Sequence, residues 1–384
     1  MPDPYDVIVA GVGTIGSATC WQLAARGARV LGLEQFDLPH SRGAHHGYSR
    51  MIRLAYYEHS AYVALVKRAY TLWDQLEGAS GQKLLYKTGG LYIGSPEGNL
   101  VSRSLAASRQ YGLNHELLDR AELARRHPSF HVPDSFAALY EPEAGFLVPH
   151  RCVAAFIDQA LRNGADLRGH EPLVDWQADD EGVTVYCAGG QYRARTLISC
   201  GGAWSQRLLG RIGVDLTVTR QVMGWFWPRR PQIFGLGQLP VWAIEGGGGG
   251  LHYGFPMVSD NPGFKISLHL PAEPTDPDNV QREPMDQDLP PLRAGLRDWL
   301  PDADGPLLAL RVCLYTNSPD AHFIIDRHPH HRRVIVACGF SGHGFKFAPV
   351  IGELLAQMAL DGRAAMPIKF FSLKRFGDDK RTED

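Results

Sequence analysis

Two glycine-rich stretches at opposite ends of the chain have the residue types that hold a charged ligand. The first, "VIVAGVGTIGSA", follows an apolar start at Tyr5 and has the spacing Gly11-x-Gly13-x-x-Gly16. Gly11 permits a tight turn, Gly13 lets the backbone approach a pyrophosphate, and Gly16 lets helix and strand pack closely. The N-terminus of the following helix attracts the phosphates. With a strand before it and a helix after it, the motif predicts a dinucleotide site.

An acidic residue completes this unit. The helix is expected to end at about Arg26, and the second apolar run, "ARVLGLE", ends at Glu34. A carboxylate at this point binds both hydroxyls of an adenosine ribose and repels a 2′-phosphate, which disfavours NADP. The unit by itself does not distinguish NAD from FAD.

The second stretch, "VIVACGFSGHGFKFAP", covers residues 334–349. Gly339, Gly342 and Gly344 let the backbone approach a ligand, and Pro349 suits the first turn of a helix. A dinucleotide has a single pyrophosphate, which the first turn already holds. FAD gains from a second positive helix end, at the edge of the flavin ring that becomes anionic on reduction. The two turns together therefore favour FAD over NAD.

Ionisable residues in the middle of the chain share one face of a predicted strand. In "FKISLHL", alternation places Lys265, Ser267 and His269 on one face and apolar residues on the other, so the polar face could line a cavity. A solvated sheet face is the simpler interpretation for a lysine. The same alternation places Tyr253 and Phe255 together.

Two arginines lie three residues apart directly after a histidine-rich loop. Arg50 and Arg53 share a face if their segment is helical. A guanidinium fork binds a carboxylate through two parallel hydrogen bonds, so an acidic substrate group is one expectation. A pair of surface arginines is the alternative.

The cysteines and the C-terminal histidines do not predict a metal site. The six cysteines are scattered, no CxxC pair is present, and most are expected to be buried thiols. The histidines of "RHPHHRR" fall in a polar turn and are expected to face solvent.

Length and composition indicate a soluble protein of about two domains. The chain has 384 residues, 44% of them hydrophobic, and a net charge of −2. Nothing in the charge favours nucleic acid or an acidic membrane surface. No apolar run is long enough to span a membrane and no signal peptide is visible, so we expect a cytoplasmic location.

The order of the predicted elements indicates one domain interrupted by another. Both ends have α/β character, while residues 217–270 alternate as in an antiparallel sheet and contain the glycine run 246–250. We predict a Rossmann-type FAD-binding domain, α/β, over residues 1–80, 145–215 and 310–384. A discontinuous antiparallel-sheet substrate domain, α+β, is predicted over residues 81–144 and 216–309.

Three stretches carry a family resemblance: "HHGYSRMIR", "CLYTNSPDAHFIID" and "GFSGHGFKFA". They resemble the monomeric sarcosine oxidase family, which includes N-methyltryptophan oxidase, and the similarity runs through nearly the whole chain. The resemblance implies a D-amino acid oxidase-like architecture and an FAD-dependent oxidase of secondary amines. It also implies that Cys313, in a C-x-Y-T motif, is covalently bound to the flavin through the 8α-methyl group.

The resemblance assigns roles to single residues. Lys265 would lie over the flavin and activate O2, because its charge stabilises superoxide. Arg53 and Lys346 would bind the substrate carboxylate. Residues expected around the reacting centre are Arg50, Tyr253, His269 and Tyr315. The expected cofactor contacts are Gly11, Gly13, Thr14, Ile15, Gly16, Glu34, Gln35, Ser41, His45, His46, Arg50, Val174, Gly201, Trp204, Cys313, Gly342, His343, Gly344 and Lys346.

The expected reaction is oxidation of an N-methyl amino acid by O2 to the demethylated amino acid, formaldehyde and H2O2. The alternatives are an FAD enzyme of cyclic amino acids such as proline, a dehydrogenase with another acceptor, and a non-catalytic flavin-binding protein. Lys265 favours an oxidase, and the implied substrate cage argues against a non-catalytic binder. We expect a monomer whose partners are a small amine and O2.

The segment from Trp242 to the five-glycine run departs from the family pattern. Because glycines have no side chains to fill space, we expect a wide pocket in which Trp242 and Phe255 supply apolar surface. This predicts that N-methyl amino acids larger than sarcosine are accepted.

Overall fold

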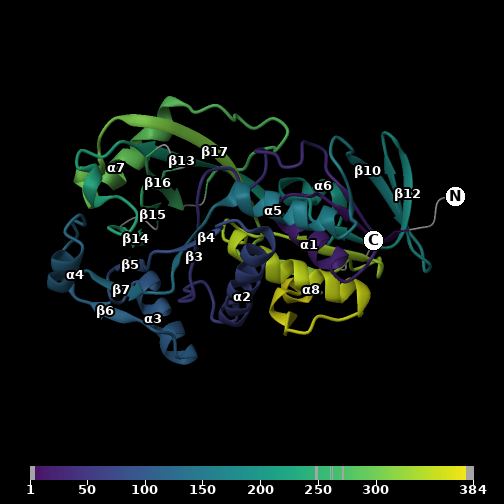
Figure 1. The fold of residues 1–384 in the computed structure, drawn as a ribbon, viewed down its shortest axis with the longest axis horizontal. Coiled ribbons are helices and arrows are strands. Elements are labelled where there is room, and N and C mark those ends of the chain that lie inside the picture. Colours follow the sequence, from purple (N-terminus) through teal and green to yellow (C-terminus); the bar gives the residue numbers. More distant parts are fainter. Residues whose placement is uncertain (1–4, 247–249, 260, 262, 270–271, 378–384) are drawn as a thin grey trace.

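A computed structural model describes residues 5–246, 250–259, 261, 263–269 and 272–377. Within them, two eight-stranded sheets and one three-stranded sheet are joined by helices (Figure 1). The α/β and α+β class is as predicted. Among the described residues, no helix is both long and apolar enough to cross a membrane.

The first sheet contains the N-terminal strand at its centre. Buried aliphatic residues such as Ile8 and Val9 make this strand, and it pairs in parallel with strands on both sides. The main path of the sheet runs β10 (Leu173–Ala178), β11 (Val183–Cys187), β12 (Gly190–Ser199), β1 (Tyr5–Ala10), β2 (Val30–Leu33) and β9 (Asp166–Arg168). From β12 it continues through β19 (Val334–Cys338) to β18 (Ile324–Arg327).

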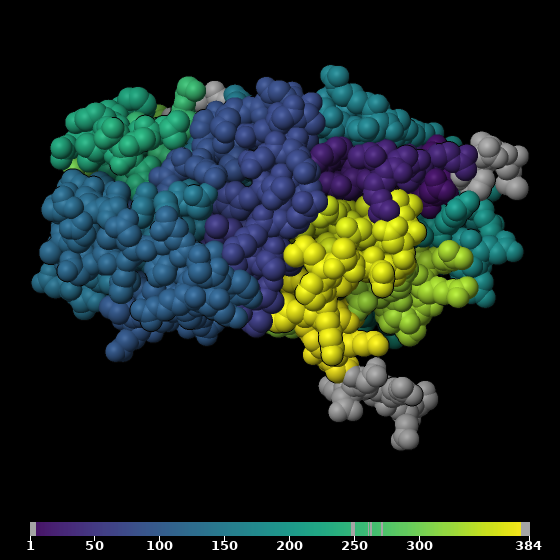
Figure 2. Space-filling model, turned by 60° about the horizontal axis from the view of Figure 1, so that its bottom comes forward, coloured from purple at the N-terminus to yellow at the C-terminus, as the bar shows by residue number. Residues whose placement is uncertain are grey.

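Four helices pack together beside this sheet: α1 (Thr14–Ala24), α2 (Tyr62–Ser80), α5 (Pro149–Arg162) and α8 (Ala348–Leu360). The first and last of them, more than 300 residues apart in the sequence, contact each other closely, because a Cβ at Gly352 would lie 2.7 Å from the carbonyl carbon of Ala18. The N-terminal and C-terminal segments accordingly adjoin on one face of the molecule (Figure 2). The strands that precede the two glycine turns, β1 and β19, belong to the same sheet.

The second sheet is antiparallel except for one parallel pair, β14 with β5. Its order is β17 (Leu307–Asn317), β13 (Thr217–Phe226), β16 (Phe264–His269), β15 (Leu251–Phe255), β14 (Val241–Glu245), β5 (Gly90–Gly94), β7 (Ala137–Glu141) and β6 (Glu116–Leu118). The helices among these strands are α3 (Asn99–Tyr111), α4 (Arg120–Arg126) and α7 (Leu289–Trp299). The short helix α6 (Ser205–Leu209) follows β12, and β8 (Gly145–Leu147) joins β3 (Arg50–Ile52) to β4 (Leu85–Lys87).

The two large sheets use the chain segments proposed for the two domains, apart from one boundary. Strand β17 belongs to the second sheet as far as Asn317, so the proposed boundary at residue 310 falls inside a strand. The division itself remains our proposal.

Two local expectations are wrong. The segment of Arg50 is the strand β3, not a helix, so the argument that helical spacing brings Arg50 and Arg53 to one face does not hold. His328 is buried rather than solvent-facing, with its Nε2 3.2 Å from the carbonyl oxygen of Leu209. Within the described part of the chain, no cluster of three or more His, Cys, Asp or Glu residues could hold a metal ion.

Candidate active site

The first glycine turn closes tightly against β12. Gly11 has φ +90°, and a Cβ there would lie 2.6 Å from the carbonyl oxygen of Cys200. A Cβ at Gly16 would overlap the carbonyl oxygen of Gly11. A Cβ at Gly13, by contrast, would meet nothing within 4 Å. Gly11 and Gly16 are therefore required for packing, while the backbone of Gly13 is open to a ligand.

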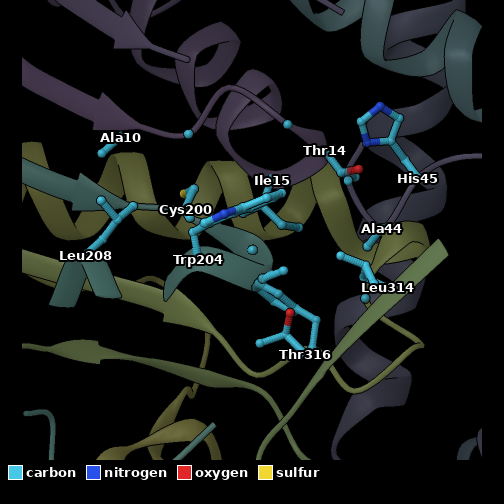
Figure 3. A pocket seen from close by; sticks show the side chains of 18 of the residues that line it. Ala10, Thr14, Ile15, Ala44, His45, Cys200, Trp204, Leu208, Leu314 and Thr316 are labelled. Atoms are coloured by element: carbon cyan, nitrogen blue, oxygen red, sulfur yellow. The ribbon is translucent and has the colours of Figure 1, made fainter. Parts of the chain in front are cut away.

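This turn borders a cavity of about 400 Å³ (Figure 3). Glu34 lies in its wall and accepts hydrogen bonds from the backbone N–H groups of Val12 at 2.9 Å and Phe36 at 3.1 Å. His45 also lines it, and its buried Nε2 has no hydrogen-bond partner among the described residues. Burial lowers the pKa of His45 to about 3, so the ring is neutral. An unpaired ring nitrogen beside an open glycine backbone fits a dinucleotide cofactor.

Most of the expected cofactor contacts lie in this wall. They are Gly11, Gly13, Thr14, Ile15, Glu34, Gln35, His45, Arg50, Val174, Gly201, Trp204, Gly342 and Gly344. Six others do not line it: Gly16, Ser41, His46, Cys313, His343 and Lys346. The last three of these line a neighbouring cavity. Figure 3 shows β17 entering the wall through Leu314 and Thr316, which sequence reasoning missed although both belong to the C-x-Y-T motif of Cys313.

The neighbouring cavity, about 90 Å³, adjoins the first, because Arg50, Tyr315, Gly342 and Phe345 line both. It brings together residues that are far apart in the sequence. Among the expected site residues, it contains Arg50, Arg53, Tyr253, His269, Cys313, Tyr315, His343 and Lys346. The ring nitrogen Nδ1 of His269 lies 3.4 Å from the Tyr315 hydroxyl. Burial lowers the pKa of His269, so its ring is neutral at pH 7.

Arg53 is buried in this cavity and already paired. Its guanidinium donates to both carboxylate oxygens of Glu58 at 2.6 and 2.7 Å, and to the carbonyl oxygen of Ala55 at 2.9 Å. Burial lowers the pKa of Arg53, but Glu58 and the smaller effects of Tyr56, Tyr57 and Tyr92 together outweigh burial, so this pKa lies above its ordinary value. Burial raises the pKa of Glu58, but Arg53 lowers it, and the result is a pKa of about 2. Glu58 was not expected, although it follows Arg53 by only five residues.

Lys346 is a second buried cation in the same cavity. Its ammonium group donates to the carbonyl oxygen of His343 at 2.9 Å and lies 3.5 Å from the Tyr56 hydroxyl. Burial and then the charge of Arg53 lower its pKa to about 7, while Glu58 opposes the shift. The site therefore has more positive than negative charge when Lys346 is protonated, which suits an incoming carboxylate.

Lys265 is fully buried on β16 and lies beside Arg50. Its ammonium group donates to the carbonyl oxygen of Ser49 at 2.8 Å and lies over the ring of Phe255 at 4.6 Å. The same carbonyl accepts from Arg50 at 2.9 Å. Burial, and then Arg50, lower the pKa of Lys265 well below its ordinary value. Lys265 lines neither cavity, but the Ser49 carbonyl joins it to Arg50, which lines both.

Comparison with known proteins shows the family to which the chain belongs. The model of the FAD dependent oxidoreductase family, abbreviated DAO, matches residues 6–358. The chain is 42% identical to a monomeric sarcosine oxidase of Streptomyces avermitilis over 98% of both chains. The chain belongs to the FAD dependent oxidoreductase family. It is therefore an FAD-dependent enzyme, and the predicted resemblance and fold class are confirmed.

Other proteins are also similar to this chain along nearly their whole length. An N-methyl-L-tryptophan oxidase of Yersinia pestis is 34% identical over 97% of this chain and 99% of its own. Among solved structures, the amino acid oxidase NikD is 26% identical with a TM-score of 0.84, covering 96% of this chain and 97% of its own. The L-proline dehydrogenase of P. horikoshii, 21% identical with a TM-score of 0.83, shares the fold.

For this FAD-dependent enzyme, Cys313 lies where the two cavities meet. Its side chain is buried with Met223, Trp225 and Tyr315, and it lines the smaller cavity, while the next residue, Leu314, lines the larger one. Burial raises the pKa of the Cys313 thiol, and the charges of Arg50 and Lys265 oppose that rise. Those two cations thus favour the thiolate, the form in which cysteine is a nucleophile.

One expected wall residue points elsewhere. Trp242 is fully buried in a different apolar cluster, with its ring against Phe130 and Phe264. Because neighbouring residues of a strand face opposite sides, Ala243 lines the smaller cavity in its place. Phe255 does not line that cavity either, since it packs under Lys265. The expectation that Trp242 and Phe255 form the substrate wall is wrong, and residues 247–249 lie outside the described part of the chain.

The pKa of Lys346 leads to a test of carboxylate binding. We expect the dissociation constant of acetate, which has no amine to titrate, to rise about tenfold as the pH rises through about 7. Lys346 loses its charge over that range, while Arg53 and Glu58 keep theirs. The change in cofactor absorbance on adding acetate measures the constant between pH 6 and pH 9. The variant Lys346→Met should bind acetate weakly at every pH, with a dissociation constant that does not change between pH 6 and pH 9. If the constant of this variant still rises with pH as in the unmodified enzyme, Lys346 is not the group that titrates.

Proposed function

We propose that the protein is a covalent-FAD oxidase of small N-methyl amino acids, with sarcosine-sized substrates preferred. The observation that carries this proposal is a small cavity with two buried cations, Arg53 and Lys346, directly beside the cofactor cavity. The names of the relatives, monomeric sarcosine oxidase and N-methyl-L-tryptophan oxidase, support the same substrate class. The predicted monomeric state and cytoplasmic location are part of the proposal.

In this proposal the substrate carboxylate takes over the guanidinium face that Glu58 now occupies, and Lys346 donates a further charge-assisted hydrogen bond. Tyr253 and the neutral His269 flank the amine, which reacts as the free base. FAD, when bound, accepts a hydride equivalent from the methyl carbon attached to nitrogen and passes two electrons to O2. The imine then takes up water to give formaldehyde and the amino acid, with H2O2 as the second product.

Lys265 acts on oxygen rather than on the amine. It is held by the Ser49 carbonyl and lines neither cavity, so it is not placed to bind the carboxylate. Burial and Arg50 lower the pKa of Lys265, and in its protonated form this buried, fixed group stabilises negative charge that develops on O2 during its reduction. This charge is the feature that favours an oxidase over a dehydrogenase with another acceptor.

The volume of the smaller cavity favours small substrates. At about 90 Å³ it is well below the roughly 300 Å³ at which pockets for drug-sized ligands begin. Leu100, Leu251 and Tyr57 lie in its wall in place of the expected Trp242. The structure thus gives no support to the larger N-methyl amino acids expected from the glycine run.

We therefore expect kcat/KM to fall in the order sarcosine, N-methylalanine, N-methyltryptophan. Peroxide release should be measured for each with the purified enzyme, and for L-proline as the cyclic alternative. Sarcosine should exceed N-methyltryptophan by at least about tenfold, because one excess methylene alone costs a pocket about 1–3 kcal/mol. Preference for N-methyltryptophan would refute the small pocket, and turnover of L-proline alone would favour the cyclic amino acids.

A further inference from the structure

A buried carboxylate that the proposed chemistry does not use lies behind Arg53. Glu141 is the last residue of β7 and is 1% exposed. Its Oε1 accepts from the backbone N–H of Leu54 at 2.6 Å, and its Oε2 accepts from that of Ala55 at 3.0 Å. The Tyr92 hydroxyl also donates to Oε2, at 2.8 Å. One carboxylate of the second sheet thus holds the segment that directly follows Arg53.

Unlike Glu58, Glu141 has neutral donors as its hydrogen-bond partners. Burial raises its pKa, and the N–H groups of Leu54 and Ala55 oppose that rise. Burying a carboxylate that has only neutral hydrogen-bond donors costs folding free energy. Such a group is retained in a protein where its hydrogen bonds fix a particular geometry. The segment that it fixes has neither helix nor strand between Arg53 and Tyr57, so its own backbone does not define its shape.

Two paths connect Glu141 to the guanidinium group of Arg53. Ala55 donates its N–H to Glu141 and accepts from Arg53 through its carbonyl oxygen at 2.9 Å. Tyr92 donates its hydroxyl to Glu141, and its ring lies 5.9 Å from the Arg53 guanidinium carbon. Glu141 lines neither cavity, so any influence on the substrate passes through Arg53 or through Tyr92, both of which line the small cavity.

We propose that Glu141 is a positioning residue for substrate binding, which holds Ala55 and Tyr92 so that Arg53 stays aimed into the small cavity when Glu58 releases it. This inference rests on the proposed function, in which Arg53 binds the substrate carboxylate. As long as Glu58 occupies Arg53, its two short hydrogen bonds orient the guanidinium group. Once the substrate takes their place, the Ala55 carbonyl and the surrounding rings are the protein contacts that remain.

The main test is Glu141→Gln. A glutamine side chain has one acceptor oxygen and one NH2 group, so one of the two backbone N–H groups loses its acceptor whichever way the amide turns. We expect KM for sarcosine, and the dissociation constant of acetate, to rise about tenfold. The limiting rate of anaerobic flavin reduction at saturating sarcosine should change less than about twofold, because the reacting groups are untouched. An unchanged KM, or an equal loss in the limiting rate, would overturn the proposal.

Glu77→Ala is the control for lost stability. Glu77, on α2, also accepts from two adjacent backbone N–H groups, those of Leu84 and Leu85, at 2.6 and 2.8 Å. Among the described residues, neither Glu77 nor these two amide groups hydrogen-bond to Arg53. We expect Glu77→Ala to lower the melting temperature and leave KM unchanged. An equal rise in KM would show that general loosening, not positioning, explains the effect of Glu141→Gln.

Two more variants keep the outcomes separable. Tyr92→Phe removes the hydrogen bond to Glu141 but keeps the ring, and it should raise KM for sarcosine about threefold. If Glu141→Gln does not fold, an unchanged KM in Tyr92→Phe overturns the proposal.

Arg53→Lys tests the assumption that Arg53 binds the substrate carboxylate, and it should raise KM more than Glu141→Gln does. If Arg53→Lys leaves KM unchanged, the proposed carboxylate site is wrong; if only the Glu141 and Tyr92 variants are silent, the positioning role is wrong.

Discussion

Lys265→Met is expected to slow the reoxidation of reduced enzyme by O2 about 10²–10³-fold. The reason is the loss of a preorganised charge, which is worth roughly 3–4 kcal/mol in comparable sites. Lys265 is 0% exposed and held by Ser49, so the substitution removes a charge that is fixed inside the protein, and Arg50 is left as the other cation at the Ser49 carbonyl. Stopped-flow absorbance at several O2 concentrations measures the rate. Anaerobic reduction by sarcosine should change much less, because Lys265 does not line the substrate cavity.

Lys346→Met is the matched control for this experiment, since it also removes a buried lysine near the cofactor. It should raise KM for sarcosine and leave reoxidation by O2 close to that of the unmodified enzyme. The two variants thus separate the two half-reactions. If Lys265→Met slows both half-reactions equally, Lys265 is a structural residue or a substrate ligand. If Lys346→Met slows reoxidation as strongly, the oxygen site lies in the small cavity.

Local patterns predicted a large part of the fold and of the cofactor site. The strand, turn and helix around Gly11 and Gly13 need only short-range geometry, and the structure has them as expected. Strand alternation is equally local, and it placed Lys265 and Ser267 on one buried face of β16, opposite the core residue Ile266. Such predictions succeed because a two-residue or 3.6-residue period fixes the direction of a side chain relative to its neighbours.

The pairing of groups from distant segments could not be read from the sequence. Strand alternation predicts that Trp242 and Ala243 face opposite sides of β14, but it does not predict which side faces the substrate cavity. The side is decided by how α7 and the neighbouring strands pack against β14. The Arg53–Glu58 pair was missed because carboxylates near arginines are common on surfaces, and only burial makes this pair significant. Glu141 reaches the Arg53 segment across 86 residues, a contact that only the tertiary fold creates.

The largest qualitative effect is expected at Cys313. In the enzyme as isolated, acid precipitation should leave the flavin colour in the protein pellet, and Cys313→Ser should move it to the supernatant. Attachment replaces one C–H bond of the 8α-methyl group by a C–S bond, an oxidation whose two electrons O2 takes up. Only the thiolate attacks; burial raises the pKa of this thiol, and the charges of Arg50 and Lys265 offset part of that rise. A serine hydroxyl has no comparable anion near pH 7.

Cys200→Ser provides the control, because Cys200 is a second buried cysteine and lines the larger cavity. Burial raises the pKa of Cys200 to about 12, and neither a lysine nor an arginine is among the causes of that shift. It should therefore stay a thiol, and Cys200→Ser should retain covalent flavin. Flavin that stays attached in Cys313→Ser, or is lost in Cys200→Ser, would show that the attachment site is wrongly assigned. Since the nearby charges of Arg50 and Lys265 distinguish the reactive thiol from Cys200, Lys265→Met should also slow attachment when apoprotein is incubated with FAD.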